Sequence, residues 1–271
     1  MRPRLTRYPV YGTNGGVEVF STTRHGGVSV GNHGTFNING YCGDLPENIL
    51  TNKKLLADEL GIDVQHIIMP HQTHGTVARC IDADFLNKSE EERRLLLEGV
   101  DAVFTDLPCI CVGVSTADCI PVLLYDPLQG VVAAVHAGWR GTVARIAGKT
   151  IKAMAEAFGC ASNDMVAWIG PGISIDAFEV GDEVYDTFVD AGFDMQGIAQ
   201  RFPAADSMAA DGCKWHVDLV ECNRRQLVEA GVDEHSIYVS GICTFNNCTD
   251  YFSARRLGIN SGRIYSGILL K

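Results

Sequence analysis

The sequence predicts a single α+β domain that contains mixed β-sheets. Short apolar segments rich in β-branched residues alternate with segments of helical periodicity. Some neighbouring strands are separated by a helix and others by a tight turn, and such hairpins do not occur in a purely parallel wound sheet. The 271 residues are 46% hydrophobic and 20% charged, which is sufficient for a large core.

Strands are expected where apolar residues alternate or run together between turn residues. In chain order they are 17–22, 65–69, 100–105, 110–115, 120–125, 131–136, 166–169, 236–242 and 263–269. Helices are expected where apolar residues recur with helical spacing between capping signals. They are 44–60, 89–97, 143–158, 181–190 and 218–230. Pro46 fits the first turn of the first helix, and three glutamates after Ser89 suit the start of the second.

The most informative stretch is a predicted hairpin between 120–125 and 131–136. The connecting residues 126–130 include Asp, Pro and Gly, which favour a turn. In the register that follows from this turn, position 120 faces His136, and a slip of one residue brings Cys119 opposite His136 instead. In either register a thiol and an imidazole meet at the open end of the hairpin.

A Gly-rich turn and an amphipathic helix follow the hairpin. Thr142 is the expected N-cap of helix 143–158, which ends before Gly159. Arg140 then lies at a helix N-terminus, where N–H groups and the helix dipole favour anions.

Charge and composition limit the partners of the protein. The net charge of −11 argues against nucleic-acid binding, which requires basic surfaces. No signal peptide or membrane-spanning apolar run is recognisable, so a cytoplasmic location with mostly reduced thiols is expected. Among the ten cysteines, Cys109 and Cys111 are expected to share a buried strand face, and the role of Cys243 and Cys248 stays open. Neither a G-x-G-x-x-G nor a Walker A sequence indicates a nucleotide cofactor.

Several segments resemble the signature of the YfiH-like, laccase-domain family. They are Gln72-x-His74-Gly75, Ala117-Asp118-Cys119-x-Pro121 and Val135-His136-Ala137-Gly138-Trp139-Arg140-Gly141, and further matches extend over nearly the whole chain. The resemblance implies one laccase-type domain over residues 1–271, folded as an α-β-β-α layered sandwich.

The resemblance also implies a zinc site formed by His74, Cys119 and His136. Three ligands leave one tetrahedral position open, as in catalytic zinc sites, although a thiolate also suits copper(I). The activity implied is phosphorolysis of purine nucleosides, namely adenosine, inosine and S-methyl-5′-thioadenosine, with deamination of adenosine. The older family label is polyphenol oxidase, but a multicopper oxidase uses His-x-His pairs and the eight histidines form none.

Phosphorolysis requires cations that hold inorganic phosphate, and Arg24 and Arg140 are the candidates. Asn37 is expected either to contact ribose or to hold a turn. Asp118 is expected either to cap its loop or to orient a ligand and accept a proton. One alternative is a cysteine hydrolase acting on cell-wall precursors, with Cys119 as nucleophile and His136 as base. Another is a metal-binding protein without catalytic activity.

Overall fold

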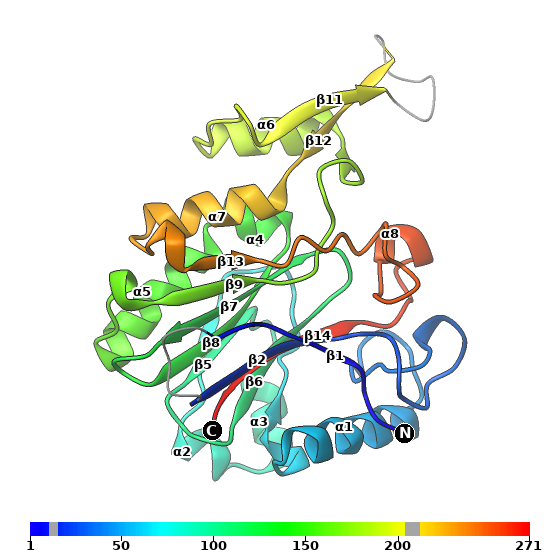
Figure 1. Cartoon of the computed structure of the whole chain (residues 1–271), viewed down its shortest axis with the longest axis vertical. Coiled ribbons are helices and arrows are strands. Elements are labelled where there is room, and N and C mark those ends of the chain that lie inside the picture. The colour runs from blue at the N-terminus through cyan, green and yellow to red at the C-terminus, as the bar shows by residue number, and fades with distance from the viewer. Residues whose placement is uncertain (11–15, 204–211) are drawn as a thin grey trace.

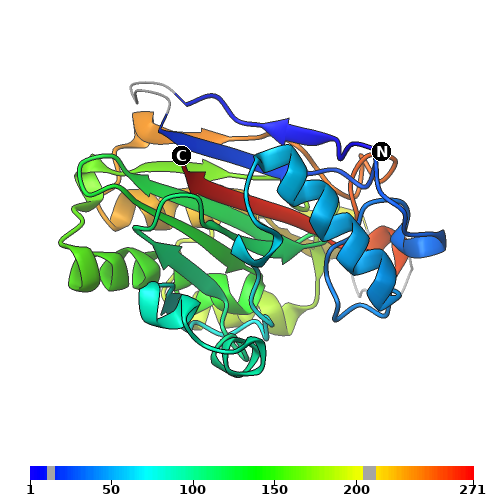
Figure 2. The same cartoon turned by 90° about the horizontal axis from the view of Figure 1, so that it is seen from below.

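The computed structural model describes residues 1–10, 16–203 and 212–271. Two β-sheets pack face to face, and helices cover their outer faces (Figure 1, Figure 2). Helix α1 (Pro46–Leu60) lies on one side, and α5 (Ile146–Phe158) and α7 (Leu219–Glu229) lie on the other. The predicted α-β-β-α sandwich with mixed sheets is therefore confirmed.

The first sheet has the strand order β1-β2-β14-β6-β3. Its strands are β1 (Leu5–Arg7), β2 (Val17–Thr22), β14 (Ile264–Leu270), β6 (Cys111–Thr116) and β3 (Ile67–Ile68). Only the β3–β6 pair is parallel. Phe20 and Tyr265 pack against Leu56 of α1 on the outer face, and residues such as Ile268 face the second sheet.

The second sheet has the strand order β13-β9-β7-β8-β5-β4. Its strands are β13 (Ile237–Val239), β9 (Val166–Ile169), β7 (Ile120–Asp126), β8 (Val131–Ala137), β5 (Ala102–Thr105) and β4 (Ala78–Cys80). One face contributes Leu123 and Val132 to the core between the sheets, and the other packs on α5 and α7. Strands β7 and β8 are buried along their full length, which explains their continuous apolar sequence.

A smaller sheet extends from this body beside α6 (Asp182–Asp190), as Figure 1 shows. It contains β10 (Glu179–Val180), β12 (Cys213–Val217) and β11 (Ala199–Pro203) in that order. The remaining short helices are α2 (Ala83–Leu86), α3 (Glu90–Leu96), α4 (Trp139–Val143) and α8 (Ala254–Leu257). None of the helices in the described ranges is long and apolar enough to cross a bilayer.

Both predicted registers of the β7–β8 hairpin are wrong. Asp126 pairs with Val131, and His136 therefore faces Pro121. The turn begins one residue later than expected because the Asp126 carboxylate accepts hydrogen bonds from the backbone N–H groups of residues 128 and 129. Positions 119 and 121 are two residues apart, so this register still leaves Cys119 on the His136 side of the hairpin.

The helix expected to begin after Thr142 is divided into α4 and α5. Gly138 is the N-cap of α4, and Arg145 adopts a left-handed conformation, with φ 59°, at the break between the two helices. Thr142 caps neither helix, because its hydroxyl lies inside α4 and accepts a hydrogen bond from buried Asn223 at 3.1 Å. The predicted apolar stripe is present on α5, where Ile146 and Met154 are fully buried.

The expected pairing of Cys109 and Cys111 on one buried face is also wrong. Cys111 begins β6 and is fully buried, whereas Cys109 lies before the strand, is exposed and has a φ of 60°. All ten cysteines lie in the described ranges, and none of them forms a disulfide bond.

Glu59 on α1 fastens the N-terminal segment to the body of the protein. Hydrogen bonds from Arg2 and Arg7 lower the pKa of Glu59 to about 2. A depressed pKa stabilises the fold above the unfolded pKa near 4.5, and this contribution is lost as pH falls through about 2. We expect Glu59→Gln to lower stability by about 1 kcal/mol near neutral pH, because water screens the exposed arginines. In thermal melts, the Tm difference from wild type should shrink below pH 4.5, and a constant difference would contradict this.

Candidate metal and catalytic site

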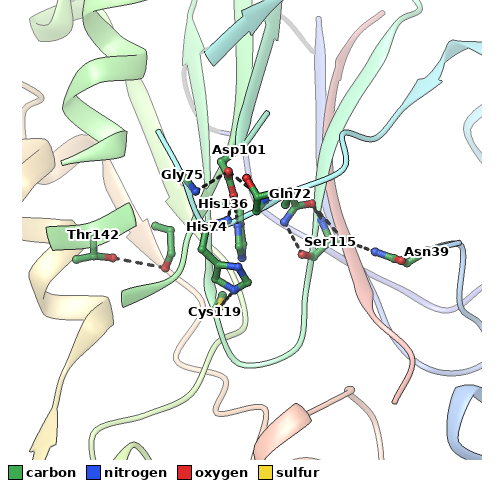
Figure 3. Close-up of polar contacts among 11 residues, drawn as sticks. Asn39, Gln72, His74, Gly75, Asp101, Ser115, Cys119, His136 and Thr142 are labelled. Atoms are coloured by element: carbon green, nitrogen blue, oxygen red, sulfur yellow. Dashed lines mark hydrogen bonds and ion pairs between the residues drawn. The ribbon is translucent and has the colours of Figure 1, made fainter. Parts of the chain in front are cut away.

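Three side chains from separate segments converge at one end of the second sheet (Figure 3). His74 lies in the loop between β3 and β4, Cys119 in the bend between β6 and β7, and His136 on β8. Their ligand atoms all lie within 4.8 Å of one another, and His74 Nε2 is 3.9 Å from Cys119 Sγ. Among the described residues, this is the one group of three or more His, Cys, Asp or Glu side chains with such spacing.

The site has a buried side and an open side. His136 is only 3% exposed, whereas His74 is exposed and Cys119 is intermediate. The two imidazole rings meet edge to face with their centroids 4.9 Å apart. A small molecule can therefore approach from the His74 side while His136 is held in the protein.

Two polar anchors hold the loop that carries His74. The carboxylate of buried Asp101 bonds to the loop backbone and to His136, and the Gln72 amide pairs with the backbone of Ser115 in both directions at 2.8 Å (Figure 3). Asn39 extends this network, because its amide donates to the Ser115 hydroxyl at 2.6 Å. The site is thus linked by hydrogen bonds to the first sheet.

Electrostatic coupling favours a charge-separated pair in the metal-free site. Burial opposes ionisation of the Cys119 thiol, but His136 and His74 outweigh it and lower the pKa of Cys119. Burial alone would lower the pKa of His136, yet the Cys119 thiolate and Asp101 raise it. Because cysteine binds a metal as a thiolate and histidine binds it as a neutral imidazole, a dication bound here would displace the proton from His136.

The donor set and its spacing fit a zinc ion. In a tetrahedral zinc site with bonds of about 2.0 to 2.3 Å, the ligand atoms lie roughly 3.3 to 3.6 Å apart. The three ligand atoms here, all within 4.8 Å of one another, would therefore need to approach each other by about an ångström to bind zinc. One thiolate with two imidazoles is a ligand set that zinc accepts, and copper(I) accepts it too. The three side chains leave one tetrahedral position for water or substrate.

The lack of a side chain at Gly138 leaves room for His74 and Cys119 to approach a bound metal. A Cβ at this position would lie 2.9 Å from His74 Cδ2 and 3.0 Å from Cys119 Sγ, so both ligands would have to move. We expect Gly138→Ala to weaken zinc binding by roughly tenfold or more, the usual scale for perturbed support of a metal ligand. Competition titration with a chromophoric chelator measures this. Gly148→Ala is the matched control, because nothing lies within 4 Å of a Cβ at Gly148, and equal affinities in the two variants would refute the steric argument.

Asp118 fixes the bend that presents Cys119. One oxygen accepts a hydrogen bond from the Thr244 hydroxyl at 2.7 Å, and the other accepts from the Arg255 backbone N–H at 2.7 Å. The backbone of Asp118 adopts a φ of 93°, which a non-glycine residue rarely does, and these bonds hold it there. Of its two expected roles, the loop contact is therefore present, and proton transfer stays a prediction.

Asn37 is fully buried away from solvent and holds the chain around it. Its amide nitrogen donates to Asp44 at 2.9 Å, and its oxygen accepts from the backbone N–H groups of Asn39 and Arg263. These contacts correspond to the turn-holding role that the sequence allowed. A contact with ribose stays a prediction.

The two candidate phosphate-binding arginines have different surroundings. Arg24 donates through Nε to Gly34 O at 3.0 Å and through Nη1 to Cys248 O at 2.7 Å, and it stacks over Phe252. Arg140 is exposed on the first turn of α4, beside the site, with its guanidinium 4.3 Å from the Trp139 ring centroid. Within the described residues no carboxylate pairs with Arg140, so its full fork is available to an anion.

Sequence reasoning did not identify Asp101. It lies directly before β5, where an isolated acidic residue next to an apolar strand gives little sign of its partners. Its complete burial next to two histidines becomes visible only in three dimensions. Cys243 and Cys248 are not part of the site, and buried Cys243 contacts the Ser174 hydroxyl instead.

Comparisons with known proteins find relatives over nearly the whole length of the chain. A protein-family model described as multi-copper polyphenol oxidoreductase laccase matches residues 18–271. A Bacteroides thetaiotaomicron protein named purine nucleoside phosphorylase is 43% identical over 267 residues, which is 98% of this chain and 96% of that protein. A protein named adenosine deaminase RL5, from an unknown prokaryotic organism, is 44% identical over 94% of this chain and 95% of its own. The crystal structure of the Bacillus licheniformis hypothetical protein YfiH matches with a TM-score of 0.84 and 29% identity, over 94% of this chain and 93% of that one.

Proposed function

Because the chain belongs to the YfiH-like, laccase-domain family, we propose that it is a zinc-dependent purine nucleoside phosphorylase that also deaminates adenosine. The observation that carries this proposal is the cluster of His74, Cys119 and His136, with three donors and one accessible side. The names of two relatives support the two reactions. Adenosine, inosine and S-methyl-5′-thioadenosine are the proposed nucleosides, with inorganic phosphate as co-substrate.

The two reactions differ in the bond that breaks. In phosphorolysis a phosphate oxygen bonds to C1′ of the ribose, the C1′–N9 bond breaks, and the released purine takes up a proton. In deamination water adds to C6 and ammonia leaves. A bound metal would polarise an oxygen or lower the pKa of a water at the open position.

The residues around the cluster supply orientation and charge. Asp101 holds the Nδ1 atom of His136, so that its Nε2 atom faces the cluster. Arg140 is the first candidate to hold phosphate. Its guanidinium has no carboxylate partner in the described chain, and Arg140 follows Gly138 by two residues. Arg24 is the second candidate, with fewer free donors, since its Nε and Nη1 groups each donate a hydrogen bond to a backbone carbonyl.

A multicopper oxidase activity is disfavoured by the number of ligand groups. Such enzymes hold several copper ions, mostly through histidine, whereas the described residues contain a single His–Cys–His group. The laccase label therefore describes the family and not our proposal for the reaction.

A cysteine hydrolase is the second candidate function. The Asp101 carboxylate orients His136 at 2.8 Å, and His136 lies beside the Cys119 thiol, which is the arrangement of a Cys–His–Asp triad. His74 distinguishes the two candidates, because a triad has no use for a second imidazole next to the sulfur. Cell-wall precursors are the substrate class for this alternative.

One experiment separates these candidates. Protein of measured zinc and copper content is incubated with adenosine, with and without phosphate, and the products are identified. Ribose-1-phosphate with adenine in the presence of phosphate, and inosine in its absence, are expected from zinc-loaded protein. A metal-free protein that hydrolyses an amide substrate would favour the cysteine hydrolase, and the absence of ribose-1-phosphate from zinc-loaded protein would refute the phosphorylase.

A further inference from the structure

One buried carboxylate contacts the segments of both candidate histidine ligands. Asp101 is fully buried between the His74 loop and β8. Its Oδ1 atom accepts from His136 Nδ1 at 2.8 Å and from the His74 backbone N–H at 2.9 Å. Its Oδ2 atom accepts from the N–H groups of Gly75 at 2.7 Å and Thr73 at 3.2 Å.

The three consecutive N–H groups form a nest around the carboxylate. His74 is left-handed, with φ 64°, a conformation that costs a residue with a Cβ roughly 1 to 2 kcal/mol. In this conformation the N–H groups of Thr73, His74 and Gly75 all point toward the same position, where they stabilise an anion. The Asp101 carboxylate supplies that anion from within the chain, and the strained loop in turn places the imidazole of His74.

The same carboxylate fixes the orientation of the His136 ring. A carboxylate that already receives three backbone N–H groups is an acceptor, so Nδ1 of His136 carries the hydrogen and donates it. The Nε2 atom is then unprotonated when the ring is neutral and faces the cluster. The His136 backbone N–H also donates to the Asp101 carbonyl at 2.8 Å, so ring and backbone are held at the same place.

We propose that Asp101 is the positioning residue that sets both imidazoles for metal binding, through the nest on one side and the ring of His136 on the other. Within the described residues, the side-chain hydrogen bonds of Asp101 go to His136 and to the backbone of the His74 loop, and none goes to Cys119. The inference rests on the proposed metal dependence but not on the proposed nucleoside chemistry.

Glu98 provides a matched control in the same segment. Its carboxylate is hydrogen-bonded to His71 Nδ1 at 2.7 Å, so Glu98 and His71 form another histidine–carboxylate pair. His71 lies three residues before His74, and Glu98 lies three residues before Asp101. That pair is partly exposed and outside the cluster. Glu98→Gln removes a carboxylate from a histidine without touching the cluster.

The test compares zinc affinity in wild type, Asp101→Asn and Glu98→Gln by chelator competition on stripped protein. An asparagine directs an NH₂ group at backbone donors, so it breaks the nest while preserving size. We expect Asp101→Asn to weaken zinc binding about 10- to 100-fold, and to change the visible absorption of the cobalt(II)-substituted protein. Glu98→Gln should match wild type. Wild-type affinity together with an unchanged cobalt spectrum in Asp101→Asn would overturn the proposal.

A measurement on wild type covers the case in which Asp101→Asn does not fold. Long-range ¹H–¹⁵N spectra of the zinc-loaded protein report the state of each ring nitrogen. We expect His136 to carry a hydrogen on Nδ1 and metal on Nε2, and the reverse assignment would overturn the proposal. If wild type shows these properties but yields no ribose-1-phosphate, the positioning role stands and the proposed function fails.

Discussion

The Cys119→Ala variant is expected to lose zinc and at least about a thousandfold in nucleoside turnover, or roughly 4 kcal/mol in transition-state stabilisation. The thiolate is the only anionic donor in the cluster, and two neutral imidazoles hold a dication weakly. The fold should persist, because Cys119 lies in a bend, its side chain is not part of the apolar cores, and Asp118 still anchors the loop.

Metal analysis, product analysis with adenosine and a thermal melt measure the three parts of this result. Cys248→Ala is the matched control, because this thiol is also partly exposed and lies outside the cluster, so metal content and turnover should stay at the wild-type level. Retained zinc with full turnover in Cys119→Ala would disprove the role of the thiolate. A wild type that binds no metal but loses activity on the same substitution would indicate the nucleophile of a hydrolase.

Strong local signals explain what the sequence predicted correctly. The bounds of β2 and β9 were predicted to the residue, since both are short β-branched segments between clear breakers. Strands β10, β11 and β12 were missed because they form a small, partly exposed sheet with weak apolar alternation. The hairpin register failed because one side-chain contact, from Asp126, shifts the turn by one residue.

In the candidate site, too, some residues could be predicted from the sequence and others could not. The grouping of His74, Cys119 and His136 could be predicted from the sequence, because the hairpin brings two of them together and the family resemblance supplies the third. Asp101 and the space at Gly138 depend on packing between segments far apart in sequence, which no local pattern encodes. Residues that support a site are therefore harder to predict from sequence than the residues that form it.

The Arg140→Ala variant is expected to lose phosphorolysis selectively. A protein with a net charge of −11 repels phosphate on average, so the reaction needs a local cation. Arg140 is exposed beside the cluster without a carboxylate partner in the described chain, and it carries a rigid fork of donors. Loss of a charged hydrogen bond costs about 1.5 to 3 kcal/mol, which corresponds to roughly ten- to hundredfold in the rate of phosphate-dependent cleavage.

Deamination uses water in place of phosphate, so inosine formation from adenosine should fall much less than ribose-1-phosphate formation. Lys152→Ala controls for net charge, because Lys152 is an exposed cation on α5 whose partner is Glu156, and its product ratio should equal that of wild type. Arg24→Ala should also lower Tm, since Arg24 holds two backbone carbonyls. Because fewer of its N–H donors are available to phosphate, its product ratio should change less than that of Arg140→Ala. Equal losses of both products in Arg140→Ala would show that this arginine does not bind phosphate specifically, and the cation would then have to be sought elsewhere around the cluster.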